Sequence, residues 1–374
     1  MKDEMTKSTL KPPFRADHVG SLLRPTAIAE ARKAGVTGDA LREIEDREIP
    51  AMIKMQEEVG LKVVTDGEAR RAFWHFDYMG MLDGLDLVQR DPDAGIAFHG
   101  VKTPPTVSTI TKKLDFPADH PMLEHFKFVK DHTSVCPKIS IPGPSAAHFR
   151  TAPEDIFVEE YKDPEVFTAA LAECWKKAVG AFYDAGCRYL QLDDIFFAYL
   201  GDPKHRALWE SRGQDPDWLI DRYAWMLNEA IKDRPEDMTI GMHMCRGNFR
   251  STHAAEGSYE AAADAIFNKA DVDIYFMEYD TDRAGGLEPL RLLPKGNKRV
   301  MAGFITTKTP ELEPMDDIKR KFEEASKYAD MDQLGIAPQC GFSSTEEGNA
   351  VTMDDQRRKL ELVIKVSQEL WDDA

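Results

Sequence analysis

The feature that most constrains the fold is a regular alternation of short apolar runs with longer amphipathic segments. Eight apolar runs of strand length follow one another, at residues 14–20, 61–64, 138–141, 188–192, 238–244, 273–277, 299–305 and 334–338. Helical patterns lie among them at 39–59, 164–185, 216–232, 258–269, 315–329 and 354–371. Strands that alternate with helices predict βαβ units and a parallel sheet. Eight such units in one chain predict an α/β fold of the (β/α)8 TIM-barrel type.

The segment 70–133, between the second and third predicted strands, is too long for an ordinary connection. It contains an aromatic cluster at 73–78 and a stretch of alternating polar residues at 106–116. We predict that 70–133 is an insertion with a hairpin over the barrel mouth, within a single barrel domain spanning 1–374. A doubly wound open sheet is the alternative architecture, but no G-x-G-x-x-G follows the first predicted strand.

Composition narrows the classes of partner and compartment. The formal net charge is −18, and no run of lysine or arginine interrupts the mixed charges. This balance argues against binding to nucleic acid or to an anionic membrane. The N-terminal residues lack an apolar signal core, and no apolar run approaches the roughly 18 residues of a membrane span. With five widely spaced cysteines, the sequence predicts a cytoplasmic protein with free thiols.

Catalytic groups of a parallel barrel lie at the carboxyl ends of its strands. Polar residues of this chain gather at those positions in seven of the eight predicted units. These residues are Asp17, His18 and Ser21, then Asp66 and Glu68, then Asp193 and Asp194, then His243 and Cys245, then Glu278 and Asp280, then Thr306, Thr307 and Lys308, then Gln339 and Cys340. One mouth is therefore expected to collect several carboxylates, a histidine and two cysteines.

His243 and Cys245 are two residues apart, so their side chains point to the same face of a strand. An isolated pair of this kind is more often a buried core pair than a metal site. Cys340 and Glu278, at the ends of other strands, complete a set of four ligands that suits Zn²⁺. Zinc lowers the pKa of a bound thiol, so the chemistry predicted here is thiolate activation. The other cysteines are predicted to serve packing: Cys136, Cys174 and Cys187.

Taken together, these stretches resemble the C-terminal catalytic barrel of cobalamin-independent methionine synthase. The matching stretches are HVGS (18–21), VVTDGEARR (63–71), GCRYLQLDD (186–194), HMC (243–245), DIYFMEYD (273–280) and APQCGF (337–342). Short single-barrel relatives of that enzyme are similar at RADHVGSLLRP (15–25), CRGNFRS (245–251) and PQCGFSSTEEGN (338–349).

The resemblance implies a role for particular residues of this chain. It implies zinc ligation by His243, Cys245, Glu278 and Cys340, and binding of homocysteine by Ser21, Glu68 and Asp193. The implied reaction moves a methyl group from methyltetrahydrofolate to the zinc-bound sulfur of homocysteine. The implied partners are therefore a small-molecule thiol and a methyl donor, and a homo-oligomer is compatible with the sequence without being required by it.

The sequence departs from the family on the side of the methyl donor. Ile305 occupies the place of the family's general-acid histidine, and Gly303 that of its partner aspartate. Arg150 or its neighbours occupy the place of the tryptophan that stacks on folate. His18 is our candidate for the missing acid, although a histidine bonded to the backbone is the plainer interpretation. Trp74, His75 and Tyr78 are candidates for a donor-pocket wall, and a hydrophobic lid is the alternative.

Two other functions stay open at this point. A zinc-dependent thiol alkyltransferase with another electrophile, as in epoxyalkane:coenzyme M transferase, has the same thiol chemistry. A non-catalytic zinc barrel is the second, although a carboxylate ligand is less typical of a structural site than four cysteine or histidine ligands. Retained Glu68 and Asp193 favour an amino-acid thiol, since sulfonate thiols lack an ammonium group. Asn248 is predicted to hold the metal loop by hydrogen bonds.

Overall fold

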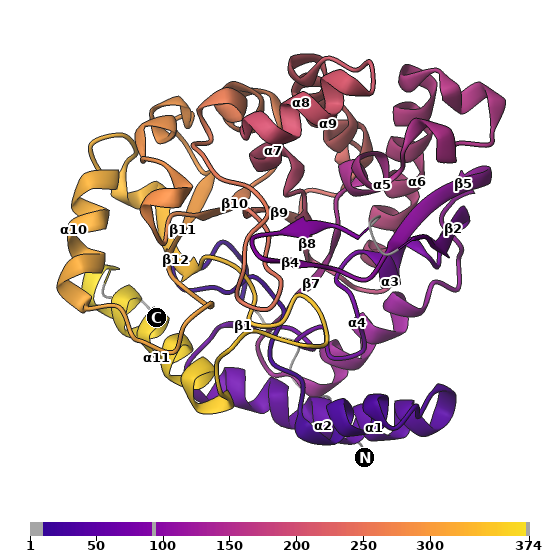
Figure 1. The fold of residues 1–374 in the computed structure, drawn as a ribbon. Coiled ribbons are helices and arrows are strands. Elements are labelled where there is room, and N and C mark those ends of the chain that lie inside the picture. The colour runs from indigo at the N-terminus through magenta and orange to yellow at the C-terminus, as the bar shows by residue number, and fades with distance from the viewer. Residues whose placement is uncertain (1–9, 92–94, 372–374) are drawn as a thin grey trace.

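A parallel β-sheet forms the centre of the computed structural model, which describes residues 10–91 and 95–371 (Figure 1). Six strands pair in the order β12-β11-β10-β9-β8-β7, and every pairing is parallel. The prediction of an α/β fold with a parallel sheet is thereby confirmed. The strands are β7 (Ile139–Pro142), β8 (Tyr189–Asp193), β9 (Thr239–Met244), β10 (Ile274–Glu278), β11 (Arg299–Ile305) and β12 (Leu334–Pro338).

Both edges of this sheet are extended by shorter pairings. At one edge, β6 (Cys136–Pro137) lies just before β7 in the chain and pairs in parallel with β1 (Val63–Val64). At the other edge, the first predicted strand contributes one isolated parallel bridge, between Ala16 and Ile336 of β12. Hydrogen bonds then link that first segment to the chain after β1. Leu22 N donates to Gly67 O over 2.9 Å, and the Thr65 hydroxyl donates to Gly20 O over 2.6 Å.

Helices surround the strands in Figure 1. The longest run of apolar helix begins at a cap in the sequence: the Asp163 carboxylate accepts from Glu165 N over 2.8 Å, in front of Pro164 at the first helical position. The helices are α1 (Thr26–Lys33), α2 (Gly38–Glu58), α3 (Phe76–Met79), α4 (Pro121–His132), α5 (Pro144–Arg150), α6 (Pro164–Asp184), α7 (Phe196–Tyr199), α8 (Pro203–Ser211), α9 (Pro216–Ile231), α10 (Met315–Ala325) and α11 (Met353–Trp371).

The helix expected at 258–269 has a different form. A 3-10 turn covers Glu260–Ala262, and a π-helical turn covers Ala265–Lys269. The wide turn ends in a bond from Ala270 N to Ala265 O of 2.8 Å. No helix in the described ranges is long and apolar enough to cross a membrane.

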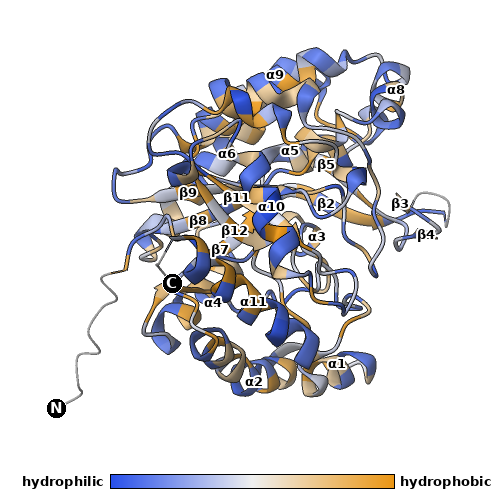
Figure 2. Ribbon diagram, turned by 90° about the vertical axis from the view of Figure 1, so that its left-hand side faces the viewer, coloured by the Kyte–Doolittle hydropathy of each residue, from blue (hydrophilic) through white to orange (hydrophobic). Residues whose placement is uncertain are grey.

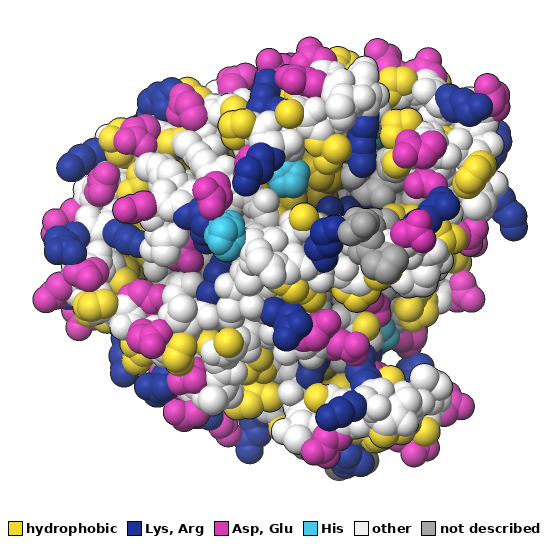
Figure 3. Space-filling view, viewed as in Figure 1, with side chains coloured by type: hydrophobic (Ala, Val, Ile, Leu, Met, Phe, Trp, Pro, Cys, Tyr) yellow, Lys and Arg dark blue, Asp and Glu magenta, His cyan; other side chains and the backbone are white. Residues whose placement is uncertain are grey.

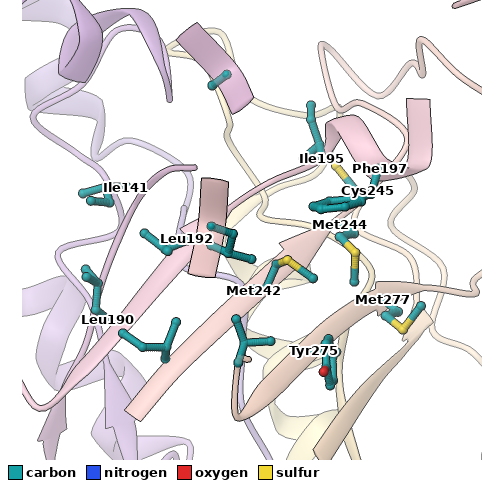
Figure 4. Packing of buried hydrophobic residues seen from close by; sticks show 14 of the residues in the cluster. Ile141, Leu190, Leu192, Ile195, Phe197, Met242, Met244, Cys245, Tyr275 and Met277 are labelled. Atoms are coloured by element: carbon teal, nitrogen blue, oxygen red, sulfur yellow. The ribbon is translucent and has the colours of Figure 1, made fainter. Parts of the chain in front are cut away.

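Side chains alternate along each strand between two sides of the sheet. Leu190, Leu192, Met242 and Met244 belong to the large core cluster (Figure 4). A second, smaller cluster collects residues of the opposite parity, Tyr189, Ile274, Phe276, Met301 and Ala337, with Phe14, Val19, Val63 and Cys136. Because side chains alternate with period two, Asp193 and His243 share the side of Tyr189 and Phe276. Both polar side chains therefore point to the side of the sheet that carries the smaller cluster.

The long segment between β1 and β6 contains two antiparallel pairs. Strand β2 (Asp83–Gln89) pairs with β5 (Thr106–Asp115), and β3 (Ala97–Phe98) pairs with β4 (Val101–Lys102). Figure 2 shows β3 and β4 at one edge of the molecule, away from the helices α2 and α11. His99 N donates to His253 O over 2.8 Å, so the β3–β4 turn is tied to the loop that follows β9.

Candidate functional site

Three soft ligands meet where β9 and β12 end. His243 is on β9, Cys245 follows that strand, and Cys340 follows β12. Their ligand atoms all lie within 4.8 Å of one another, and all three residues are buried. The two sulfur atoms are 3.6 Å apart, close to the roughly 3.8 Å edge of a tetrahedral zinc site with Zn–S bonds of about 2.3 Å. His243 Nε2 is buried without a hydrogen-bond partner, so the donor set fits a metal ion.

The electrostatics of these three residues favour a cation among them. The contact with Cys245 has the largest effect on the pKa of Cys340. Together with the nearby His243 it lowers that pKa well below its usual range, although burial alone would raise it. Burial lowers the pKa of His243, but the adjacent Asp193 carboxylate and Cys340 sulfur raise it to about 10. Both shifts have the direction expected where negative charge is concentrated, which a divalent ion would neutralise.

Glu278, the fourth predicted ligand, is fully buried at the end of β10 but is not part of that group of three. One carboxylate oxygen is paired with Arg283, and the other accepts from Arg246 N over 2.7 Å. Burial raises the pKa of Glu278, but the cations Lys308, Arg283 and Arg246 lower it overall. The structure thus contains an ionised carboxylate beside the site, and its coordination to a metal stays a prediction.

Two carboxylates predicted to bind the acceptor face the same cavity. Asp193 Oδ1 lies 3.3 Å from His243 Nδ1. Glu68 accepts from the Ser140 hydroxyl over 2.9 Å, and its other oxygen is buried without a hydrogen-bond partner, 3.5 Å from the nearest Arg71 nitrogen. Burial, with help from Asp193 and against Arg71, raises the pKa of Glu68 to about 7. The Glu68 oxygen without a hydrogen-bond partner suits a cationic ligand.

The backbone of Glu68 is also unusual for a residue with a side chain. Its φ is +56°, in the left-handed region that costs non-glycine residues free energy. Gly67 before it has a φ of +64°, and a Cβ there would come within 2.4 Å of Met52 Cε. The tight double turn directs the Glu68 carboxylate into the cavity, and strain of this kind is concentrated at functional sites.

Ser21, the third predicted acceptor-binding residue, lies against the loop that carries Cys340. A Cβ at Gly341 would come within 1.8 Å of the Ser21 hydroxyl, so only glycine fits there. Phe342 N donates to Ser21 O over 2.9 Å. Ser21 is buried next to the metal-ligand loop, although it is not among the residues that line the cavity.

The cavity is lined by two chemically different sets of residues. One set carries ligand atoms and carboxylates and consists of His243, Cys245, Cys340, Glu68 and Asp193. The other set is largely apolar and comprises Val19, Phe73, Trp74, Ile96, Phe98, Ile195 and Tyr199, with Arg150 among them. The face seen in Figure 3 is hollowed near its centre, where hydrophobic and histidine side chains are exposed among charged ones.

The structure separates the three residues expected in the donor-pocket wall. Trp74 lines the cavity, whereas His75 and Tyr78 lie behind it and are completely buried. The His75 ring stacks on Phe76 at 4.1 Å, and Tyr78 packs against Trp175 at 5.5 Å. The cluster therefore combines one pocket residue with packing residues.

His18, the candidate acid, is buried beside Lys138 rather than in the cavity lining. Lys138 Nζ donates to His18 O and, over 2.7 Å, to the Asp17 carboxylate. Burial and the Lys138 charge lower the pKa of His18 well below its usual range. A neutral imidazole in that position is a poor acid at neutral pH.

Asn248 ties together the loops that carry the two cysteines. Its amide donates to Gly341 O over 2.8 Å and to the Ser344 hydroxyl over 3.1 Å, while its oxygen accepts from Lys308 over 3.0 Å. Hydrogen bonds of this kind orient metal ligands. Phe98, from the β3–β4 turn, is a lining residue that sequence patterns did not indicate, because its position depends on contacts of the hairpin with the loop after β9.

Residues 19–359 match the family model described as the catalytic domain of cobalamin-independent synthase. The chain belongs to this family. It is 46% identical to the Bacillus subtilis protein named "Uncharacterized protein YxjG" over 367 residues, which cover 96% of each chain. Membership of the cobalamin-independent synthase family confirms the resemblance found in the sequence.

Solved structures of this synthase family share the fold. A putative vitamin-B12-independent methionine synthase from Listeria monocytogenes matches with a TM-score of 0.76 and 36% identity, covering 97% of this chain and 99% of its own. A B12-independent methionine synthase from Shewanella sp. W3-18-1 matches with a TM-score of 0.71 and 19% identity, covering 96% and 98%. Both likenesses extend over nearly the whole chain, including the segment between β1 and β6.

Proposed function

We propose that this chain is a zinc-dependent methyltransferase that methylates the thiol of homocysteine, with a methyltetrahydrofolate as candidate donor. The site lies at the mouth of a (β/α)8 barrel that the insertion 70–133 covers. The observation that carries the proposal is the meeting of two features in one cavity. Three buried ligands, one histidine and two cysteines, converge there, and they share the cavity with the carboxylates Glu68 and Asp193, of which Glu68 has one oxygen without a hydrogen-bond partner.

His243, Cys245 and Cys340 are the zinc ligands in this proposal, with Glu278 as the fourth. When bound, zinc supplies a lowered pKa for a coordinated thiol, which keeps the acceptor sulfur as a thiolate at neutral pH. Arg283 pairs with Glu278 and would hold this carboxylate beside the site whether or not it coordinated the metal.

The carboxylates Glu68 and Asp193 hold the ammonium group of the acceptor, and Ser21 completes the acceptor site beside the Cys340 loop. Held there, the acceptor sulfur faces the apolar half of the cavity, where the donor binds. The sulfur forms a bond to the methyl carbon as the bond from that carbon to the donor breaks. The bonding electron pair stays with the donor's leaving atom, which takes a proton from solvent in the cavity.

The comparisons support this proposal at the level of the family. The Shewanella protein, which shares the fold, was solved in complex with selenomethionine, an analogue of the expected product. A thiol alkyltransferase with another electrophile is the second candidate, and the altered donor side, where Arg150 joins the cavity wall, is the observation that favours it. A non-catalytic zinc barrel is disfavoured, because the ligands face a cavity that Glu68 and Asp193 also line, and a purely structural site has no need of such carboxylates.

Zinc-edge X-ray absorption on the zinc-loaded protein, with and without L-homocysteine, tests the proposal. We expect the number of sulfur ligands to rise from two to three, since the acceptor sulfur replaces an oxygen ligand. Cys340→Ser should remove one sulfur from both spectra and lower the zinc content. An unchanged sulfur count with homocysteine, or wild-type protein that binds no zinc, would contradict the proposal.

A further inference from the structure

Arg150 is a cation on the donor side of the cavity. It is the last residue of α5, and its side chain lines the same cavity as Cys245 and Cys340. Its guanidinium carbon lies 5.1 Å from the centre of the Phe196 ring and 5.8 Å from that of Phe149. Helix α5 therefore places a positive charge within an otherwise apolar wall.

No carboxylate among the described residues pairs with this guanidinium within 4.0 Å, whereas most arginines of the chain have such a partner. Its Nε is buried and has no hydrogen-bond partner. Burial lowers the pKa of Arg150, and the largest opposing influence is the Tyr199 hydroxyl rather than an acid. Arg150 is partly exposed, and a partly buried cation without an anion still costs free energy because its desolvation is not repaid by an ion pair.

Stacking of Arg150 on Phe149 and Phe196 does not replace the missing anionic partner. Cation–π contact satisfies the face of a guanidinium, while its N–H donors project from the edge of the plane. Guanidinium edges match carboxylates and other oxyanions in a bidentate way. Tyr199 is a neutral partner for the Arg150 guanidinium, and no carboxylate of the described residues meets its edge within 4.0 Å.

The two charged sides of the cavity are chemically distinct. Glu68 and Asp193 provide negative charge beside the three metal-ligand residues, and Arg150 provides positive charge beside Trp74, Phe98 and Tyr199. A ligand with an ammonium group suits the first side. A ligand with a flat apolar body and an anionic group suits the second, because aromatic walls bind such a body and the guanidinium binds the anion.

We infer that Arg150 determines donor specificity by binding an anionic group, such as a carboxylate, on a methyl donor with a flat apolar body. The inference rests on the proposed function for its assignment of the second ligand as the donor. It places the anion-binding group in the same cavity as the acceptor carboxylates. The donor's methyl carbon then lies between the anion and the acceptor sulfur.

Calorimetric titration of the zinc-loaded protein with benzoate and with benzamide tests this inference. The two probes share a flat ring and differ in charge, so their affinity ratio reports the anion site. We expect wild type to prefer benzoate at least tenfold, Arg150→Gln to lose that preference, and Arg150→Lys to recover part of it. No preference in wild type, or an unchanged preference in Arg150→Gln, would overturn the inference.

Two controls separate misfolding and failure of the proposed function from failure of this inference. Arg188→Gln removes an arginine that pairs with Asp237 on the surface over 2.8 Å, and it should leave both affinities unchanged. L-Methionine should bind wild type and Arg150→Gln with affinities within twofold of each other, which shows that the variant is folded. If methionine binds neither protein while the benzoate preference depends on Arg150, the acceptor assignment fails and the anion site stands.

Discussion

His243 Nδ1 lies 3.3 Å from Asp193 Oδ1, and the two residues are register partners on the adjacent strands β9 and β8. This contact fixes the imidazole so that Nε2, which has no hydrogen-bond partner, remains for a metal. Asp193 Oδ1 also accepts from Gln191 Nε2 over 2.8 Å. One carboxylate thus orients a metal ligand and faces the acceptor cavity.

Asp193→Asn should weaken zinc binding as well as acceptor binding. An amide in this position still occupies the space but no longer attracts the Nδ1 proton as a carboxylate does. Loss of such an orienting partner typically lowers metal affinity about 10- to 100-fold. Competition with a zinc chelator measures the affinity, and Asp237→Asn on the surface is the matched control. Unchanged zinc affinity in Asp193→Asn would show that the contact has no orienting role.

Glu278 provides a second test of the ligand set, because its carboxylate pairs with Arg283 and is also the proposed fourth metal ligand. Glu278→Gln should lower zinc affinity by about tenfold or more if the carboxylate is the fourth ligand. Arg283→Gln frees Glu278 from its ion pair, and zinc affinity should then stay equal or rise. Chelator competition on the two variants gives both values. Equal affinity of Glu278→Gln and wild type assigns Glu278 to the ion pair alone.

The pKa of Glu68 predicts how acceptor-site affinity depends on pH. Burial raises this pKa to about 7, so the free protein carries a neutral Glu68 below pH 7 and a carboxylate above it. An ammonium group binds the carboxylate, so methionine affinity should rise with pH up to about 7. Below that value it should fall by about tenfold for each pH unit, and binding should release a proton.

Calorimetry with L-methionine in buffers of different ionisation enthalpy measures both effects. In Glu68→Gln the affinity should be lower and its dependence on pH between 5 and 8 should disappear. The same raised pKa also affects folding. Protonated Glu68 stabilises the folded state, and this contribution is complete below the ordinary pKa of 4.5. It is lost as the pH rises through 7. A pH-independent methionine affinity in wild type would contradict this assignment.

Much of the thiol side was predictable from the sequence, because strand ends in a parallel sheet are local features. The apolar runs fixed where β9 and β12 end, and the residues that follow them, Cys245 and Cys340, therefore meet. The pairing of Glu278 with Arg283 was not predictable, since it depends on the path of a short turn after β10. Phe98 was missed for a related reason: its hairpin is held by tertiary contacts such as His99 N to His253 O.

The aromatic cluster 73–78 shows the same division between local pattern and tertiary position. Its composition indicated either a pocket wall or a lid, and the backbone turn at α3 separates the members. Trp74 N donates to Ser344 O over 2.9 Å, which brings its ring to the cavity. Tyr78 is directed into the core against Trp175 and His120.

Tyr78→Ala should therefore lower mainly the stability of the fold, and Trp74→Ala mainly the affinity for a ligand in the cavity. Tyr78 is completely buried, and truncating a large buried aromatic residue costs about 3–5 kcal/mol of unfolding free energy. Trp74 is partly exposed at the cavity, so its truncation should cost less stability and should weaken benzamide binding several-fold. Urea unfolding followed by circular dichroism measures the first effect, and calorimetry the second. Methionine affinity of Tyr78→Ala is the control, because Tyr78 does not line the cavity. A Trp74→Ala protein that binds benzamide as wild type does would assign Trp74 to the lid.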